Sequence, residues 1–269
     1  MRRHLLFCFL IVSVASFPLL AQKQPSTEQV QVSPPTIQRA ASPSPSATFD
    51  ELNQSGDRLR AEKAYLDALD YYRAALLKNP NSAEVYNKIG IAELQIQRYK
   101  EAHRDFEKAI KADRKFANAY NNLGAVYYEQ KKYGAAIKQY QKALKLEADV
   151  ATYYCNMGAA FFAKKDFEQA SVNYAKALEI DPDVLERHSR TGVSAQLPSP
   201  QDRARYAFVM AKLYAKSGAI DRSLEYLKRA MEEGYKDIQE VYKDSEFAGL
   251  RKDPRFADLM GSKPMAIPE

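Results

Sequence analysis

Small and aromatic residues recur along most of the chain at one constant interval. Glycine occupies positions 56, 90, 124 and 158, each 34 residues from the next. Leu or Tyr stands four residues before each glycine, an aromatic residue nine and sixteen residues after it, and alanine twelve and nineteen residues after it. The small residues let two antiparallel helices approach closely, and the aromatic residues fill the space toward the next unit. The pattern therefore predicts four stacked helix-turn-helix units, at residues 49–82, 83–116, 117–150 and 151–184.

These units resemble the tetratricopeptide-repeat family. Its 34-residue unit carries an aromatic residue, a Leu-Gly pair, a Tyr, and then Ala, Phe, Ala and a closing Pro. Leu123-Gly124 with Tyr127 fits the early positions, and Pro80 and Pro182 close the first and fourth units. The departures from the pattern are Ser55, Leu59, Glu93, Arg114 and Ala148. The resemblance implies an all-α fold, a right-handed superhelical solenoid of about five repeats closed by a short helical C-terminal cap.

Local signals indicate where the helices begin. Thr48 and Glu51 have the spacing of a capping box, and Ser82 follows Pro80-Asn81 as an expected N-cap. A two-residue turn precedes the aromatic residue that is expected to open each second helix. These aromatic residues are Tyr65, Tyr99, Tyr133 and Phe167.

The regular interval ends after the fourth unit. We predict an irregular insertion at 185–203, with Ser199 and Pro200 restarting a helix as N-cap and first helical residue. A divergent fifth repeat is expected at 204–237, with Ala211 at the glycine position. Residues 238–269 are expected to form short helices that cover the last apolar face, as the ends of repeat arrays require.

The N-terminal segment has the features of an export signal. Arg2 and Arg3 precede an apolar stretch from Leu5 to Val14, which is shorter than the roughly 20 apolar residues that span a bilayer. We predict a signal peptide at 1–21, no stable membrane insertion, and a periplasmic or secreted protein. A retained N-terminal membrane anchor is the alternative. Residues 22–47, rich in Pro, Ser and Gln and without apolar periodicity, are expected to form a disordered linker.

Composition and motifs exclude several classes of function. The net charge of +6 is spread over interleaved basic and acidic residues, so nucleic-acid binding is not expected. The sequence has no zinc-protease His-Glu pair, no paired-cysteine motif, no phosphate-binding glycine loop and no nucleophile elbow. Cys155 is interpreted as a small helix residue rather than a reactive thiol. We therefore expect no enzymatic activity, no cofactor and no metal site.

The family resemblance indicates where a ligand would bind. In that family the first helix of each repeat lines a concave groove, and residues near the glycine point into it. Asparagine amides can pair with the backbone of an extended peptide, and apolar side chains can anchor its side chains. The predicted peptide-binding residues are Asn53, Asn87, Asn121, Asn122, Asn156, Leu94, Tyr128 and Phe162. The alternative is that the asparagines are structural and that the apolar residues pack beneath the superhelix.

One specialised binding mode is excluded. The clamp that grips acidic chaperone C-termini resembles Lys and Asn around one glycine, and Lys and Arg two repeats later. Here those positions hold no cation, since their residues are Asn53 and Asp57, Asn87 and Ile91, Asn121 and Ala125, and Cys155 and Ala159.

The sequence thus predicts a non-catalytic scaffold that binds a peptide or partner protein in the groove, in envelope assembly or secretion. The alternative is a structural or oligomerisation module whose groove is filled by its own linker or by a second copy. The sequence leaves the identity of the partner and the oligomeric state open.

Overall fold

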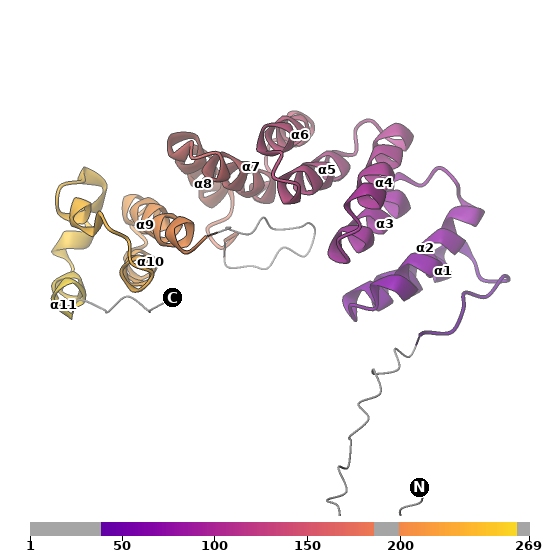
Figure 1. The fold of residues 1–269 in the computed structure, drawn as a ribbon, viewed down its shortest axis with the longest axis horizontal. Coiled ribbons are helices and arrows are strands. Elements are labelled where there is room, and N and C mark those ends of the chain that lie inside the picture. Colours follow the sequence, from indigo (N-terminus) through magenta and orange to yellow (C-terminus); the bar gives the residue numbers. More distant parts are fainter. Residues whose placement is uncertain (1–38, 186–198, 263–269) are drawn as a thin grey trace, which may run out of the picture. The chain divides into compact units, whose positions relative to one another are not determined.

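The computed structural model describes residues 39–185 and 199–262, and within these ranges every regular element is a helix (Figure 1). The prediction of an all-α fold is therefore confirmed. The predicted signal peptide at 1–21, the linker before residue 39, most of the insertion and the last residues of the predicted cap lie outside the described residues.

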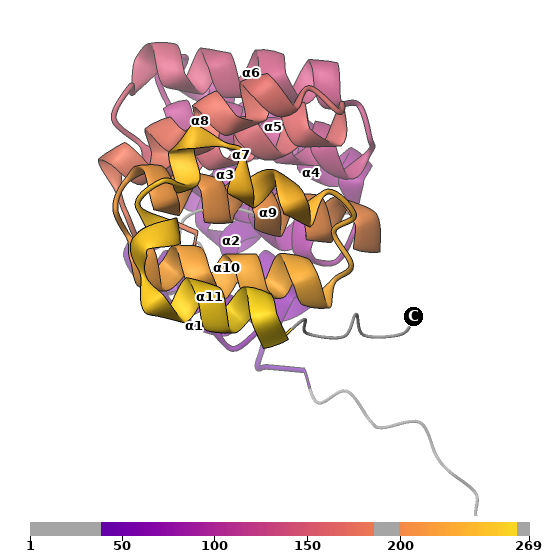
Figure 2. The same ribbon diagram turned by 90° about the vertical axis from the view of Figure 1, so that its left-hand side faces the viewer.

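The first eight helices form four pairs, one for each predicted unit. Their bounds are α1 Phe49–Ala61, α2 Tyr65–Lys78, α3 Ala83–Gln95, α4 Tyr99–Ala112, α5 Ala117–Glu129, α6 Tyr133–Leu146, α7 Ala151–Ala163 and α8 Phe167–Ile180. Each second helix begins at the aromatic residue that the sequence pattern indicated. The capping box also forms, because Thr48 N–H donates to Glu51 Oε2 at 2.8 Å and Glu51 N–H donates to Thr48 Oγ1 at 3.3 Å. Figure 2 shows the helices lengthwise, layered one behind another.

The first helix of every pair ends in the same turn. One residue of each turn adopts a positive φ of 59–65°, and these residues are Lys63, Gln97, Lys131 and Lys165. In the third pair, Lys131 N–H donates to Tyr128 O at 2.7 Å and Lys132 N–H donates to Tyr127 O at 2.8 Å. These two bonds are those of a Schellman motif, which satisfies the last carbonyl groups of a helix while the chain reverses. The turn therefore fixes how each second helix folds back on the first.

The recurrent glycines allow the closest contact within each pair. A Cβ atom at Gly124 would stand 2.5 Å from Tyr140 Cε1, and one at Gly56 would stand 2.5 Å from Tyr72 Cε1. At Gly158 the nearest ring atom, Tyr174 Cδ1, would be 3.0 Å away. The aromatic ring sixteen residues after each glycine thus lies against the first helix, in the space that a Cβ atom would occupy.

A fifth helix pair follows the gap in the described residues. Ser199 caps α9 (Pro200–Lys216) by accepting a bond from Asp202 N–H at 3.1 Å, as predicted, and α10 (Ile220–Glu232) follows after the turn at Gly218. Residues 200–203, predicted to belong to the irregular insertion, are therefore helical, because the cap starts α9 there. Ala211 stands at the glycine position, and its carbonyl accepts a bond from Ser223 Oγ at 2.7 Å.

Short helices cover the last pair. They comprise the 3-10 helices η1 Ile238–Tyr242, η2 Ser245–Phe247 and η3 Leu250–Lys252, followed by α11 Pro254–Ser262. Phe247 and Leu250 are fully buried and join the core of α9 and α10. Lys212 on α9 pairs with Asp244 at 2.6 Å and with Glu246 at 2.7 Å, which fixes η2 on that helix.

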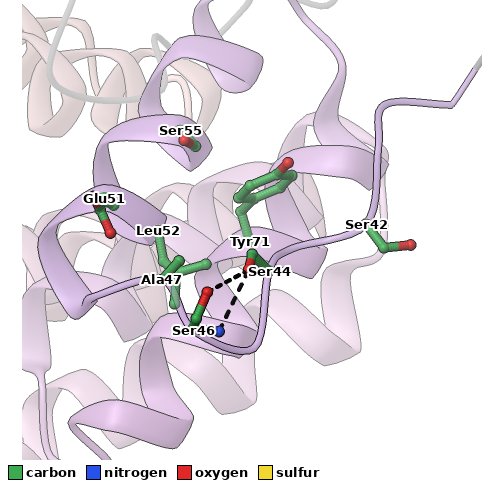
Figure 3. Close-up of a pocket in the computed structure, with 8 residues that line it drawn as sticks. All are labelled: Ser42, Ser44, Ser46, Ala47, Glu51, Leu52, Ser55 and Tyr71. Carbon is green, nitrogen blue, oxygen red and sulfur yellow. Dashed lines mark hydrogen bonds between the residues drawn. The ribbon is translucent and has the colours of Figure 1, made fainter.

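The end of the predicted linker follows a defined path along the first pair. Tyr71 Oη on α2 donates to Ala41 O at 3.0 Å, and Lys78 Nζ donates to Pro45 O at 3.0 Å. Residues 40–47 are thus not disordered, because α2 offers donors for their backbone carbonyls. In Figure 3, Tyr71 lies between this segment and α1, in an open pocket of about 470 Å³.

Neither the described helices nor their apolar stretches reach the length and hydropathy that a membrane crossing needs.

The contact between glycine and ring predicts unequal effects of adding one methyl group. Gly124→Ala should lower the free energy of unfolding by about 1–3 kcal/mol, because the core is already close-packed there. Gly158→Ala should cost less, since its contact at 3.0 Å is looser and alanine favours the helix. The matched control is Gly134→Ala in α6, where nothing lies within 4 Å and stability should rise by up to about 1 kcal/mol. Urea unfolding of the four chains measures this, and equal losses at Gly124 and Gly134 would contradict it.

Candidate interaction surface on the first helices of the repeats

A chain of side-chain amides joins the first helices of consecutive repeats. Asn156 Nδ2 donates to Asn121 Oδ1 at 2.9 Å, Asn121 Nδ2 donates to Asn122 Oδ1 at 3.1 Å, and Asn122 Nδ2 donates to Asn87 Oδ1 at 2.9 Å. The four side chains belong to α3, α5 and α7 and are all buried. Buried amides cost free energy unless they are paired, and these pair with each other.

Lys88 continues this arrangement to the first repeat. It stands two residues before its glycine, as Asn122 and Asn156 do, and its Nζ donates to Asn53 Oδ1 on α1 at 3.0 Å. In each case the donor stands two positions before the glycine of its own repeat. The acceptor stands three positions before the glycine of the preceding repeat. We call the bonds from Lys88, Asn122 and Asn156 the first-helix ladder. Lys88 was absent from the predicted site, although its repeat position was the available signal.

The ladder ends at the junction between the fourth and fifth repeats, where both the acceptor and the donor residue change. Cys155 occupies the acceptor position in the fourth repeat, and Val209 occupies the donor position in the fifth. Neither residue needs an amide partner, so no polar group is stranded at this junction. Burial, with a smaller contribution from Asp181, raises the pKa of the Cys155 thiol to about 12. The protonated thiol agrees with the interpretation of Cys155 as a packing residue.

The predicted apolar anchors lie in the core. Leu94 packs with Phe106 and Leu123, and Tyr128 lies with its ring centroid 5.3 Å from that of Tyr133. Phe162 is fully buried, with its centroid 5.0 Å from Phe167 and 6.1 Å from Tyr206 of α9. Leu94 and Phe162 therefore connect one repeat to the next, and Tyr128 packs against the second helix of its own repeat.

Of the eight predicted binding residues, the structure leaves only Asn53 half-buried and places the other seven in the interior. It brings Asn87, Asn121, Asn122 and Asn156 together in the ladder, and it places Leu94, Tyr128 and Phe162 in the packed core. Their contact with a ligand stays a prediction, and the geometry supplies the structural role that the alternative interpretation described.

Groups that remain half-exposed lie beside the ladder on the same helices. Asn118 and Thr152 stand one residue after the start of a first helix. Glu129 and Ala163 stand five residues after the glycine of a first helix. Burial raises the pKa of the Glu129 carboxyl. These residues, together with Asn53 and Cys155, form what we call the first-helix face.

The charged groups beside this face in the first two repeats pair among themselves. Lys88 Nζ lies 2.8 Å from Asp57 Oδ2 and 2.7 Å from Glu84 Oε1. Tyr72 Oη donates to Asp57 Oδ1 at 2.8 Å and accepts from Arg60 Nε at 3.1 Å. Each cation in this cluster therefore has an acceptor. No group of three or more His, Cys, Asp or Glu in the described ranges is placed to hold a metal ion.

The ladder predicts a large cost for removing one amide. Asn122→Ala would leave Asn87 Oδ1 and Asn121 Nδ2 buried without this partner, so the free energy of unfolding should fall by about 1–3 kcal/mol. Gln141→Ala, an exposed amide on α6, serves as the control and should change stability by less than about 0.5 kcal/mol. Chemical denaturation compares the two variants. Stability equal to that of the parent chain for both would show that Asn122 is not held by the ladder.

Comparisons with known proteins agree with this architecture. Family models described as tetratricopeptide repeat match residues 116–183 and 52–102, and one described as TPR repeat matches residues 92–131. No curated protein matches the chain.

Several solved structures are similar to the chain. PilF of Pseudomonas aeruginosa is 20% identical, with a TM-score of 0.53 and coverage of 80% of this chain and 97% of that chain. MamA is 23% identical, with a TM-score of 0.47 and coverage of 68% and 96%. YrrB, described as a TPR protein with an unusual peptide-binding site, is 20% identical, with a TM-score of 0.45 and coverage of 71% and 89%.

The similarity to PilF concerns the fold alone. The family models, by contrast, together cover residues 52–183, which are the four helix pairs described above. The 34-residue interval is that of a tetratricopeptide repeat, and in this structure each interval holds one helix pair with its glycine contact and its turn at a positive φ. The chain is therefore a tetratricopeptide repeat protein.

Proposed function

We propose that this protein is a non-catalytic scaffold that binds a peptide or an extended segment of a partner protein on its first-helix face, in envelope assembly or secretion. The observation that carries the proposal is the run of four matched repeats whose first helices are joined in register by the first-helix ladder. Tetratricopeptide repeats are protein-interaction modules, and the ladder holds successive first helices at a fixed spacing.

The polar and apolar groups on this face are suited to binding an extended peptide. Asn118 and Thr152 stand at the same position of consecutive repeats, and both are half-buried. Neighbouring repeats therefore offer similar groups at a regular interval, as a peptide backbone requires. Ala163 and Cys155 add small, half-buried side chains on α7.

The described part of the linker does not cover this face. Residues 40–47 bond to Tyr71 and Lys78, and both of these belong to the second helix α2. This geometry argues against residues 40–47 as the occupant of the face.

Site-specific photocrosslinking in the native host tests the proposal. A photoreactive phenylalanine analogue at Asn118 or Thr152 should crosslink one and the same partner, because both positions lie on the first-helix face. The matched control places it at Gln141 or Lys138, which are exposed on the second helix α6. A partner crosslinked from α6 and not from α5 or α7 would contradict the proposed face.

The export part of the proposal is supported by the basic start at Arg2 and Arg3 and by the apolar stretch that follows. The mature protein from the host should begin after Ala21 and appear outside the cytoplasm. Intact-mass spectrometry of the purified protein and cell fractionation measure this, and a cytoplasmic protein that retains Arg2 would refute it.

A further inference from the structure

The fifth helix pair carries a cation where the third and fourth repeats carry uncharged polar groups. Arg205 on α9 stands six residues before Ala211, which occupies the glycine position of this pair. Asn118 and Thr152 stand six residues before the glycines of their own repeats. The three side chains therefore hold the same place on their first helices, and all three are half-buried. Arg205 thus continues the first-helix face onto α9.

The ring of Phe167 holds the guanidinium group of Arg205. The guanidinium carbon lies over this ring, 4.4 Å from its centroid. The ring packs edge-on against Phe162 of α7 with the centroids 5.0 Å apart, and Phe162 lies 6.1 Å from Tyr206 of α9. A cation over a ring face is attracted to the ring, while the N–H groups of a guanidinium remain available as donors. Arg205 is therefore held at the junction between the fourth repeat and the fifth pair.

The donors of Arg205 have no acceptor within the described part of the chain. Its guanidinium forms no ion pair and no hydrogen bond with any residue that the structure describes. Asp202 stands one turn earlier on α9, but its carboxylate pairs with Lys165 and accepts from Ser199 Oγ at 2.7 Å. Arg205 therefore keeps a positive charge and several donors that the described chain does not use.

A small cavity lies beside this arginine. It has a volume of about 180 Å³, and its walls come from the start of α9 and from the segment that follows α10. Gln201 and Lys236 line it with Arg205, and both are exposed. Asp237 is the carboxylate among the lining residues, so two cations face one anion and the net charge of the walls is positive. The cavity is thus a place where an anionic group meets several donors.

We propose that Arg205 and this cavity form a subsite for a carboxylate group of the bound peptide, either an Asp or Glu side chain or the C-terminus of the peptide. The proposal rests on the proposed function. It adds the chemical class of one ligand group and the place on the first helices where that group binds.

Charge and donor geometry favour this occupant. A carboxylate accepts two parallel bonds from one guanidinium group and also offsets its charge. A backbone carbonyl would leave the charge without a counter-ion, and a basic side chain would be repelled by Arg205 and Lys236. Because the Phe167 ring already restricts the guanidinium, less side-chain freedom is lost when the ligand binds.

This subsite is distinct from the clamp for acidic chaperone C-termini. That clamp stands three residues before and one residue after the glycine, and in the fifth pair these positions hold Phe208 and Lys212. Phe208 is buried, and Lys212 is paired with Asp244 and Glu246. Arg205 lies outside both clamp positions, so its role follows from the surroundings of this chain.

Selection from a library of random 12-residue peptides, displayed with free C-termini, tests the subsite. Peptides selected on the full chain should share an Asp or Glu at one position, or should lose affinity when synthesised with an amidated C-terminus. A synthetic selected peptide should bind Arg205→Gln about tenfold more weakly, because a charge-assisted hydrogen bond is lost. The matched control, Arg203→Gln, removes an exposed guanidinium of the same helix that pairs with Glu233 at 3.5 Å, and it should bind the peptide as the parent chain does.

Changes on the peptide show whether the two groups meet. Replacing the shared acidic residue with its amide, or amidating the C-terminus, should weaken binding to the parent chain and cause little further loss on Arg205→Gln. Arg205→Lys keeps the charge without the parallel donors, so its affinity should lie between those of the parent chain and Arg205→Gln. Equal losses on the parent chain and on Arg205→Gln would overturn the contact.

Thermal unfolding separates binding from folding. Arg205→Gln should change the melting temperature little, because its guanidinium has no ion pair or hydrogen bond to lose among the described residues. Arg73→Gln should lower it more, since Arg73 donates to the buried carboxylate of Glu93 at 2.7 Å. A fall for Arg205→Gln as large as that for Arg73→Gln would mean that Arg205 serves the fold, which would overturn the proposal.

The remaining outcomes distinguish this inference from the proposed function. Peptides selected without an acidic preference or a need for a free C-terminus, and bound equally by Arg205→Gln, would overturn the subsite and leave the scaffold function standing. A library that yields no peptide for any chain would overturn both. A lower sedimentation mass of the free protein on Arg205→Gln would mean that a second copy supplies the carboxylate, which also overturns the proposal.

Discussion

Each repeat depends on the packing of one glycine against one aromatic ring. At Gly124 the Tyr140 ring occupies the space that a Cβ would fill, which brings the backbone of the first helix directly onto the second. The Schellman turn between the helices sets the angle at which that contact is made. Because the same residues recur in four repeats, the same geometry is produced four times, and the stacking of the units follows from it.

Stacking of the repeats buries polar side chains, and these side chains bond to each other at the same positions of successive repeats. An amide or ammonium two residues before one glycine meets an amide three residues before the preceding glycine. The polar groups are satisfied inside the stack, and they also fix the register of one first helix against the next. At the junction with the fifth pair, Cys155 and Val209 replace both members, and an apolar and aromatic contact through Phe162 and Tyr206 takes over.

The first-helix face is consequently not uniform. In the first two repeats, Lys88 and Arg60 beside this face both pair with Asp57. In the third repeat Ala125 and Tyr128 stand in place of Asp57 and Arg60, and Tyr140 Oη has no hydrogen-bond partner among the residues that the structure describes. The first repeat thus satisfies its buried tyrosine with its own charged residues, and the third repeat surrounds the equivalent tyrosine with less polar side chains.

The sequence alone determined the helix pairs and many of their ends. The interval of 34 residues, the cap at Thr48, the restart at Ser199 and the aromatic residues that open each second helix are local signals, and local backbone geometry obeys them. Only the tertiary structure decided which side chains face solvent. Asn121 and Phe162 share their helix faces with accessible residues, but the neighbouring repeat covers them, and periodicity within one repeat does not report what the next repeat covers. The same reason hid Lys88, whose partner Asn53 lies on another helix, and it hid the path of residues 40–47, which α2 determines.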